Sequence, residues 1–193
     1  MKLIFFIIVS IMLSFSPAAD ACVGKVLNIG VINSPEGQVL AEMLSILINE
    51  RTGTTLSIRL FKNTQELYEG VKGKQVDLLI ENTTKAMHLL NKPVEVDPNK
   101  AYQVVKTAYE KEKGLIWLKP FVFSKGTGGE PSSYTATILT VEILNNFPAL
   151  PRVIDKLGST MNDEVYAKLM KSVESGEKPK KVAKDFLKSK KLI

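Results

Sequence analysis

The 193-residue chain has one cysteine and one histidine. The single cysteine, Cys22, cannot form an internal disulfide, so disulfide cross-linking does not hold this fold together. Without a second histidine or cysteine, a zinc site of the usual nitrogen and sulfur ligands cannot be built. His88 lies in a stretch with helical spacing, which favours a surface or packing role over that of a catalytic base. The glycine-rich run at 126–129 lacks the lysine and hydroxyl residue of a phosphate loop. We therefore expect a protein that is not an enzyme and that has no cofactor or metal.

The chain has only a mild excess of positive charge. Lys and Arg total 26 and Asp and Glu total 20, which gives a formal net charge of +6. With 45% hydrophobic and 24% charged residues, the composition is that of a folded domain. Much of the positive excess falls near the C-terminus, on Lys178, Lys180, Lys181, Lys184, Lys188, Lys190 and Lys191.

These C-terminal lysines alternate with the apolar residues Val182, Phe186 and Leu187. We interpret them as the solvated face of a helix, with contact to an anionic membrane surface as the alternative. A site for single-stranded nucleic acid would need several aromatic rings between the basic residues. The tail has only Phe186, so we expect no nucleic-acid partner.

The N-terminus has the layout of a secretory signal peptide. Lys2 is followed by an apolar run over residues 3–15 and then by an Ala-x-Ala ending at 19–21. The run is shorter than the roughly 20 apolar residues that span a membrane; an uncleaved membrane anchor is the alternative. We expect residues 1–21 to be removed and the protein to be periplasmic or at the outer cell surface.

Cys22 would then be the first residue of the mature protein. Bacterial lipoproteins carry their lipid on a cysteine at this position, which makes Cys22 a lipidation candidate. Ala19 and Asp20 differ from the large aliphatic and small neutral residues of the usual lipoprotein signal. Lipidation of Cys22 and simple cleavage after Ala21 both stay open, and we expect membrane contact only through such an anchor.

Short β-rich runs alternate with helical segments in the first half of the mature chain. The first helix has Ser34 as its N-cap, Pro35 in its first turn and Gly53 as its stop. This alternation predicts an α/β fold with a mostly parallel central sheet flanked by helices. From Tyr134 onward the pattern predicts a helical C-terminus. The expected strands cover residues 25–32, 55–61, 76–80 and 114–123.

The order and spacing of three stretches carry a family resemblance. They are Leu27–Gly30 with a helix ending at Gly53, then Val76–Thr84, and then Tyr102–Tyr109 followed by Gly114–Pro120. Together with the closing helical segments they resemble the substrate-binding proteins of glycine betaine/choline/proline-type ABC importers, which have a type 2 periplasmic-binding-protein-like fold. Such proteins hold a ligand between two α/β lobes, and the chain leaves the first lobe, builds the second and returns. The resemblance implies ABC permease subunits as partners and a small osmolyte or amine as ligand.

The resemblance covers only one lobe. The part similar to the first lobe ends near Phe123, and the returning part begins near Tyr134. We therefore expect a single lobe over residues 22–193, in which 25–123 and 134–193 are joined by a Gly-rich bridge at 124–133. A short bridge costs little entropy if the two ends are adjacent. A homodimer could complete the ligand cleft.

Seven polar residues are expected at the carboxyl ends of the predicted strands. Open α/β sheets bind ligands at this edge, and loop capping is the alternative role for each residue. The tentative ligand-binding set is Asn33, Ser34, Glu36, Asn63, Glu81, Asn82 and Thr83.

An aromatic cage for a quaternary ammonium ion, which the resemblance would imply, is missing. The family has Tyr-Pro-Glu-Tyr-Thr-Gly after the third strand, and only Glu81 and Thr83 match it here. The residues that replace the family's tyrosines, proline and glycine are Leu79, Ile80, Asn82 and Thr84. We expect the aromatic residues Trp117 and Phe121 to lie in the core.

Two functions stay open. The first is a solute-binding component of an ABC importer with altered or lost ligand specificity. The second is a non-transporting exported interaction protein that uses the lobe as a scaffold.

Overall fold

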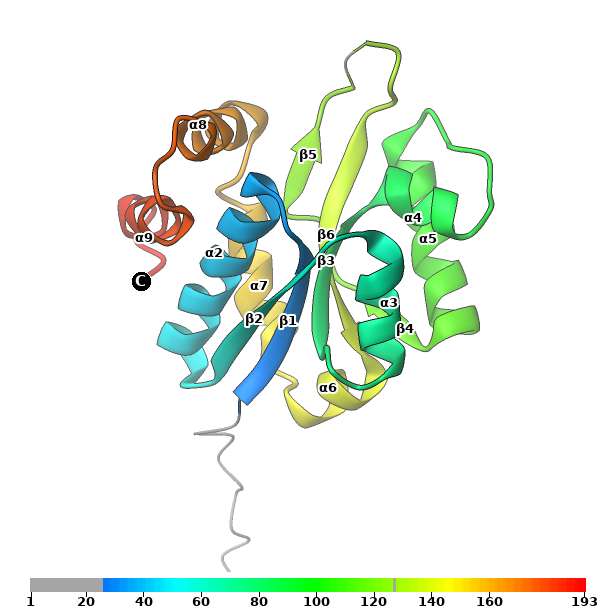
Figure 1. Ribbon diagram of the computed structural model, residues 1–193, viewed down its shortest axis with the longest axis horizontal. Helices are drawn as coiled ribbons and strands as arrows, with labels where there is room; N and C mark the ends of the chain where they lie inside the picture. The colour runs from blue at the N-terminus through cyan, green and yellow to red at the C-terminus, as the bar shows by residue number, and fades with distance from the viewer. Residues whose placement is uncertain (1–25, 127) are drawn as a thin grey trace, which may run out of the picture.

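A six-stranded sheet organises the part of the chain that the structure describes, residues 26–126 and 128–193 (Figure 1). In the computed structural model the strand order in the sheet is β2-β1-β3-β6-β4, and β5 pairs with β6. The expected signal peptide at 1–21 and Cys22 lie outside the described residues. Within the described ranges, no helix is both long enough and apolar enough to cross a bilayer.

Three parallel strands form the first half of the sheet, with β1 between the other two. Helix α2 leads from β1 to β2, and α3 leads from β2 to β3. The bounds are β1 Val26–Ile32, α2 Pro35–Thr52, β2 Thr55–Phe61, α3 Thr64–Lys72 and β3 Leu78–Asn82.

Helix α2 begins and ends as its sequence predicts. The Ser34 hydroxyl accepts a hydrogen bond from the Gly37 amide at 3.0 Å, which satisfies one of the free amides of the first turn. Pro35 follows in that turn, and Gly53 ends the helix with a φ of 72°. Glycine adopts this left-handed conformation at little cost, so the chain can reverse into β2.

Strand β6 (Ser133–Thr140) lies between β3 and β4 (Leu115–Trp117) and runs antiparallel to both. It also pairs antiparallel with β5 (Val122–Ser124). The other strands therefore share one direction, and β6 alone opposes them within the described sheet. The mostly parallel α/β sheet expected from the sequence is confirmed in strand direction, while its second half is joined by antiparallel pairing.

The prediction of helix from Tyr134 onward is wrong for β6. Six of its eight residues are buried, including Ser133, Thr135 and Thr137, so the strand lacks the alternation of buried and exposed positions that marks a half-buried strand. Periodicity cannot distinguish a short segment buried on both sides from a buried helix. The β-branched content, with Thr135, Thr137 and Ile138, was the available signal for a strand. The helical C-terminus begins only after Thr140, which caps the next helix.

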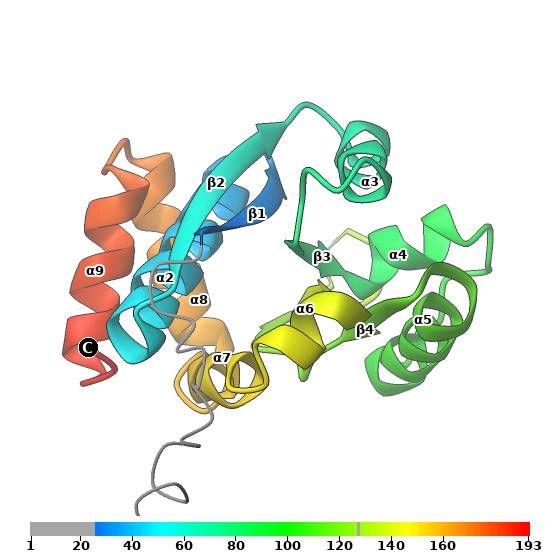
Figure 2. The ribbon, with the colours of Figure 1, turned by 90° about the horizontal axis from the view of Figure 1, so that it is seen from below.

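Helices cover both faces of the sheet. Figure 2 shows α3, α4 and α5 on one face and α2, α7, α8 and α9 on the other, with α6 at one end. His88 is exposed on α4, in agreement with a surface role. The remaining bounds are α4 Thr83–Leu89, α5 Pro98–Lys113, α6 Val141–Asn146, α7 Leu150–Gly158, α8 Asp163–Glu174 and α9 Pro179–Ser189.

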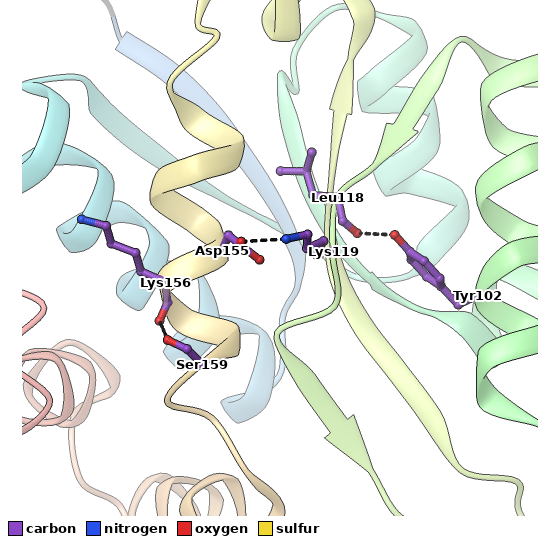
Figure 3. Close-up of polar contacts among 6 residues, drawn as sticks. All are labelled: Tyr102, Leu118, Lys119, Asp155, Lys156 and Ser159. Atoms are coloured by element: carbon purple, nitrogen blue, oxygen red, sulfur yellow. Dashed lines mark hydrogen bonds and ion pairs between the residues drawn. The ribbon is translucent and has the colours of Figure 1, made fainter.

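The strand expected over 114–123 is interrupted between β4 and β5, and this break contacts helices on both faces (Figure 3). The Tyr102 hydroxyl, from α5, donates a hydrogen bond to the Leu118 carbonyl at 3.1 Å. On the other side, the Lys119 ammonium pairs with the Asp155 carboxylate of α7 at 2.9 Å. The break therefore links the edge of the sheet to both layers of helices.

Each face of the sheet has its own hydrophobic core. The larger core packs α2, α7, α8 and α9 against the sheet and contains Phe121. The smaller core lies under α3, α4 and α5 and contains Tyr109 and Trp117, whose rings meet edge to face with centroids 5.5 Å apart. Trp117 and Phe121 each expose 2% of their surface, so both are core residues, as expected.

Strands β5 and β6 form a hairpin at the position of the Gly-rich segment. Ser124 pairs with Ser133, so the two ends of the loop are adjacent, as the single-lobe interpretation requires. The Gly126 amide donates to the Ser132 hydroxyl at 3.1 Å inside the loop. Gly128 and Gly129 have φ values of 63° and 90°, which favour glycine.

Gly30 sets how closely α3 packs on β1. A Cβ atom at this position would lie 2.5 Å from Leu67 Cδ1 of α3 and 2.9 Å from Val76 Cγ1. We therefore expect Gly30→Ala to lower the free energy of unfolding by about 1–3 kcal/mol through overpacking. Urea unfolding measures this, with Thr55→Ala at the exposed start of β2 as the control. Equal stability of the Gly30→Ala variant and the native chain would contradict the packing described here.

Candidate functional site

A small cavity lies at the carboxyl ends of β1 and β3, beside the first turns of α2 and α4. Its volume is about 30 Å³, enough for roughly one or two water molecules. Four of the seven residues predicted from the sequence line it, namely Ser34, Glu36, Glu81 and Asn82. The other lining residues are Val31, Ile32, Gly37, Leu40, Ile80, Lys85 and Thr135.

Local capping explains why polar groups gather here. Ser34 caps α2, and the Asn82 side chain caps α4 by accepting from the Lys85 amide at 2.8 Å. A Cβ on Gly37 would lie 2.3 Å from the Ile32 carbonyl oxygen, so glycine lets the first turn of α2 approach the end of β1. The cavity is thus framed by two helix starts.

Glu81 is the central polar group of the site. It lies on β3 with 4% of its surface exposed. Its Oε1 accepts from the Asn82 amide at 3.0 Å, and its Oε2 has no hydrogen-bond partner among the described residues. Burial raises the pKa of Glu81 from its ordinary 4.5 to about 7; the Asn82 amide and the Lys85 charge oppose this, and the Glu36 charge adds to it. Glu81 therefore changes charge near neutral pH.

Glu36 connects this edge to a distant part of the chain. The Tyr166 hydroxyl of α8 donates a hydrogen bond to the Glu36 carboxylate. Burial, followed by the charge of Glu36, raises the pKa of Tyr166 well above its usual range, so it stays a neutral donor. Tyr166 holds the carboxylate beside the cavity.

The sequence prediction missed Lys85, Thr135 and Tyr166. Lys85 lies four residues after Glu81, and that spacing could have identified it. Thr135 could not be placed, because its segment was predicted to be a helix. Tyr166 is 130 residues from its partner Glu36, so only the folded chain brings the two together.

Three predicted residues do not line the cavity. The Asn33 side chain accepts from the Gln38 side-chain amide at 2.9 Å. Asn63 caps α3 by accepting from the Glu66 amide at 2.9 Å. Thr83 is fully buried, and its hydroxyl accepts from the Tyr134 amide at 3.2 Å. Loop capping and packing account for these positions, and a ligand role for them stays a prediction.

The lining residues combine two carboxylates, one exposed ammonium group and no aromatic ring. These residues therefore cannot bind a cation through aromatic faces, whereas they can bind one through ionic contacts and hydrogen bonds.

A larger open groove of about 1,040 Å³ lies near the amino ends of the strands, between α3, α5 and α6. None of the predicted site residues lines that groove.

The raised pKa of Glu81 predicts a pH-dependent stability. Between pH 4.5 and about 7 the folded protein holds a proton that the unfolded chain releases, so the free energy of unfolding falls as pH rises through this range. We expect Glu81→Gln to remove about 2–3 kcal/mol of that fall. Urea unfolding at several pH values measures the effect, with Glu50→Gln at an exposed position as the control. Parallel pH profiles for Glu81→Gln and the native chain would refute the assignment.

Solved structures share this fold at low sequence identity. A crystal structure of a glycine betaine/carnitine/choline ABC transporter has a TM-score of 0.78 and 13% identity, covering 87% of this chain and 98% of the other. Apo YehZ from Escherichia coli has a TM-score of 0.74 and 13% identity, covering 87% and 99%. Lactococcal OpuAC, in its closed conformation with glycine betaine, has a TM-score of 0.59 and 9% identity, covering 86% and 96%. These likenesses confirm a periplasmic-binding-protein-like fold.

The family itself is shown by sequence. No curated protein matches the chain significantly. The family model for the substrate-binding domain of the ABC-type glycine betaine transport system matches residues 25–129, more than half of the chain. Members of this family are periplasmic or extracellular binding proteins rather than enzymes, and they work with ABC permease subunits. The chain, built as a single lobe, belongs to the family of substrate-binding domains of ABC-type glycine betaine transport systems.

Proposed function

We propose that this protein is an exported solute-binding component of an ABC importer of the glycine betaine and quaternary amine class, with altered ligand specificity. The observation that carries the proposal is the convergence of Ser34, Glu36, Glu81 and Asn82 on one cavity at the carboxyl edge of the sheet. Open α/β sheets bind ligands at this edge. The buried Glu81 provides a carboxylate oxygen with no partner in the described chain.

The ligand we propose is a small amine that carries N–H groups. Glu36 and the ionised form of Glu81 attract a cation, and the buried, unpartnered Oε2 of Glu81 can accept one hydrogen bond from a group that enters the cavity. A quaternary ammonium cannot donate that bond and depends on aromatic faces, which the lining residues lack. The site therefore favours a secondary amine such as proline over glycine betaine or choline.

A second surface must close over the ligand. The cavity of about 30 Å³ is far smaller than the roughly 300–1,000 Å³ of ordinary ligand pockets. In this proposal the bridge at 124–133 replaces the second lobe and joins 25–123 to 134–193 within a domain of residues 22–193. A second copy of the chain supplies the closing surface. Sedimentation with and without ligand tests this, because it predicts a dimer that ligand strengthens.

Isothermal titration calorimetry tests the ligand. We expect proline to bind with a Kd of about 1 mM, and glycine betaine and choline to bind more weakly. Glu81→Gln should weaken proline binding at least tenfold, on the scale of a lost charge-assisted hydrogen bond. Glu66→Gln removes one carboxylate outside the cavity and should leave binding unchanged. If none of the three compounds gives a heat of binding at about 10 mM, the proposal is overturned.

The alternative function is a non-transporting exported protein that uses the lobe to bind another protein. The small cavity and the absence of aromatic rings from its lining favour this alternative. It predicts that the folded protein gives no heat with the three compounds and that Glu81→Gln changes stability alone. Calorimetry together with the pH profile of unfolding distinguishes the two functions.

Export is tested by the mass of the protein in its native host. We expect the cell-envelope form to begin at Cys22, after removal of residues 1–21. Lipidation would add the mass of acyl chains to that form, and Cys22→Ser would then release the protein into the soluble fraction. A Cys22→Ser variant with unchanged fractionation would indicate simple cleavage, and an intact N-terminus would refute export by signal peptide.

A further inference from the structure

The C-terminal helix α9 has one buried face and one strongly basic face. Its buried residues are Val182, Ala183, Phe186 and Leu187, and they join the larger core. Figures 1 and 2 show α9 packed beside α2 on the outer side of the molecule, away from α4 and α5. The opposite face of α9 is therefore free of other elements.

Lys184 and Lys188 continue along α9 a row that starts at Lys180, which borders a shallow pocket shared with Glu42 of α2 and Leu60 of β2. They are spaced by four residues, so on a helix they lie one above another. All three are exposed, as are the neighbouring Lys178 and Lys191. We call Lys180, Lys184 and Lys188 the lysine stripe.

The charges of the stripe are not neutralised within the described chain. Lys181 pairs with Glu177 at 3.2 Å and with Asp185 at 3.0 Å, which occupies the nearby carboxylates. No ion pair within the described ranges includes a stripe lysine. Like charges four residues apart destabilise a helix, so the stability of α9 does not explain the stripe.

The far end of α9 lies at the end of the molecule where the chain enters the sheet. Val26, the first residue of β1, pairs with Thr55 at the start of β2. Nearby, the Arg51 guanidinium at the end of α2 donates to the Leu192 carbonyl at 2.8 Å. Cys22 precedes Val26 by four residues, which span at most about 14 Å. A membrane attachment at Cys22 would keep the stripe close to the lipid surface.

We propose that the lysine stripe docks this protein on a membrane surface rich in anionic phospholipid headgroups. Lysines held near such a surface each strengthen binding about fivefold. Exposed charges act within roughly one Debye length, about 8–10 Å at ordinary salt, so a row of lysines along one helix acts together. The stripe adds an electrostatic contact to the lipid anchor that the sequence suggests, and it does not depend on the solute that the cavity binds.

Vesicle co-sedimentation of the full chain tests the proposal. The vesicles are phosphatidylcholine alone or phosphatidylcholine with about one quarter phosphatidylglycerol, at low and high salt. We expect tighter binding to the anionic vesicles than to the neutral ones, and high salt should remove this difference. Replacing all three stripe lysines by glutamine should weaken this binding about a hundredfold. The apolar run at 3–15 is the same in every variant and cancels in the comparison.

The matched control replaces Lys92, Lys100 and Lys111 by glutamine. These lysines are exposed on the α4 and α5 side, and their loss lowers the net charge equally. We expect the control to bind anionic vesicles within about threefold of the native chain. Equal losses for both triple variants would mean that net charge alone drives binding and would overturn the proposal. So would binding that is equal on neutral and anionic vesicles, or a stripe variant that is folded by circular dichroism and binds normally.

Discussion

The pairing of β6 with β3, β4 and β5 holds the two halves of the chain together. The first three strands form a parallel unit, and β4 and β5 contact it only through β6 in the order of the sheet. Because β6 is buried on both faces, it belongs to both hydrophobic cores at once. The polypeptide reaches β6 through the β5–β6 hairpin and leaves it through α6 for α7, α8 and α9, which pack on α2. The position of β6 thus determines where α6 to α9 can pack.

The same strand completes the edge that carries the candidate site. Thr135 of β6 lies opposite Asn82 of β3, and Glu81 follows the buried residues of that strand. Burying a carboxylate with one unpartnered oxygen costs free energy. This cost disfavours the charged form of Glu81 and therefore raises its pKa. The unpartnered oxygen is the observation on which the proposed ligand contact rests.

Two facts narrow the proposed function, namely the family to which the chain belongs and its single lobe. The family binds solutes outside the cytoplasm and works with ABC permeases. A lobe with a cavity of about 30 Å³ and no aromatic ring at its edge differs from the cage chemistry that suits quaternary amines. The proposed preference for an amine with N–H groups follows from this difference. The basic face of α9 is separate from that edge, so the proposed solute binding and the proposed membrane contact can be tested independently.

The sequence by itself determined the α/β class, the parallel first half, the Ser34 cap and the family, and it offered capping as the alternative role for Asn63 and Asn82. These depend on local spacing, turn chemistry and short-range order, which a single chain displays. Only the tertiary structure decided that residues 133–140 form a strand, because a segment buried on both faces shows no regular alternation of buried and exposed positions. It also decided that Tyr166 meets Glu36 across 130 residues, and that Asn63 and Thr83 lie outside the cavity. Contacts of that range depend on how strands order in the sheet, which the pattern of one sequence does not specify.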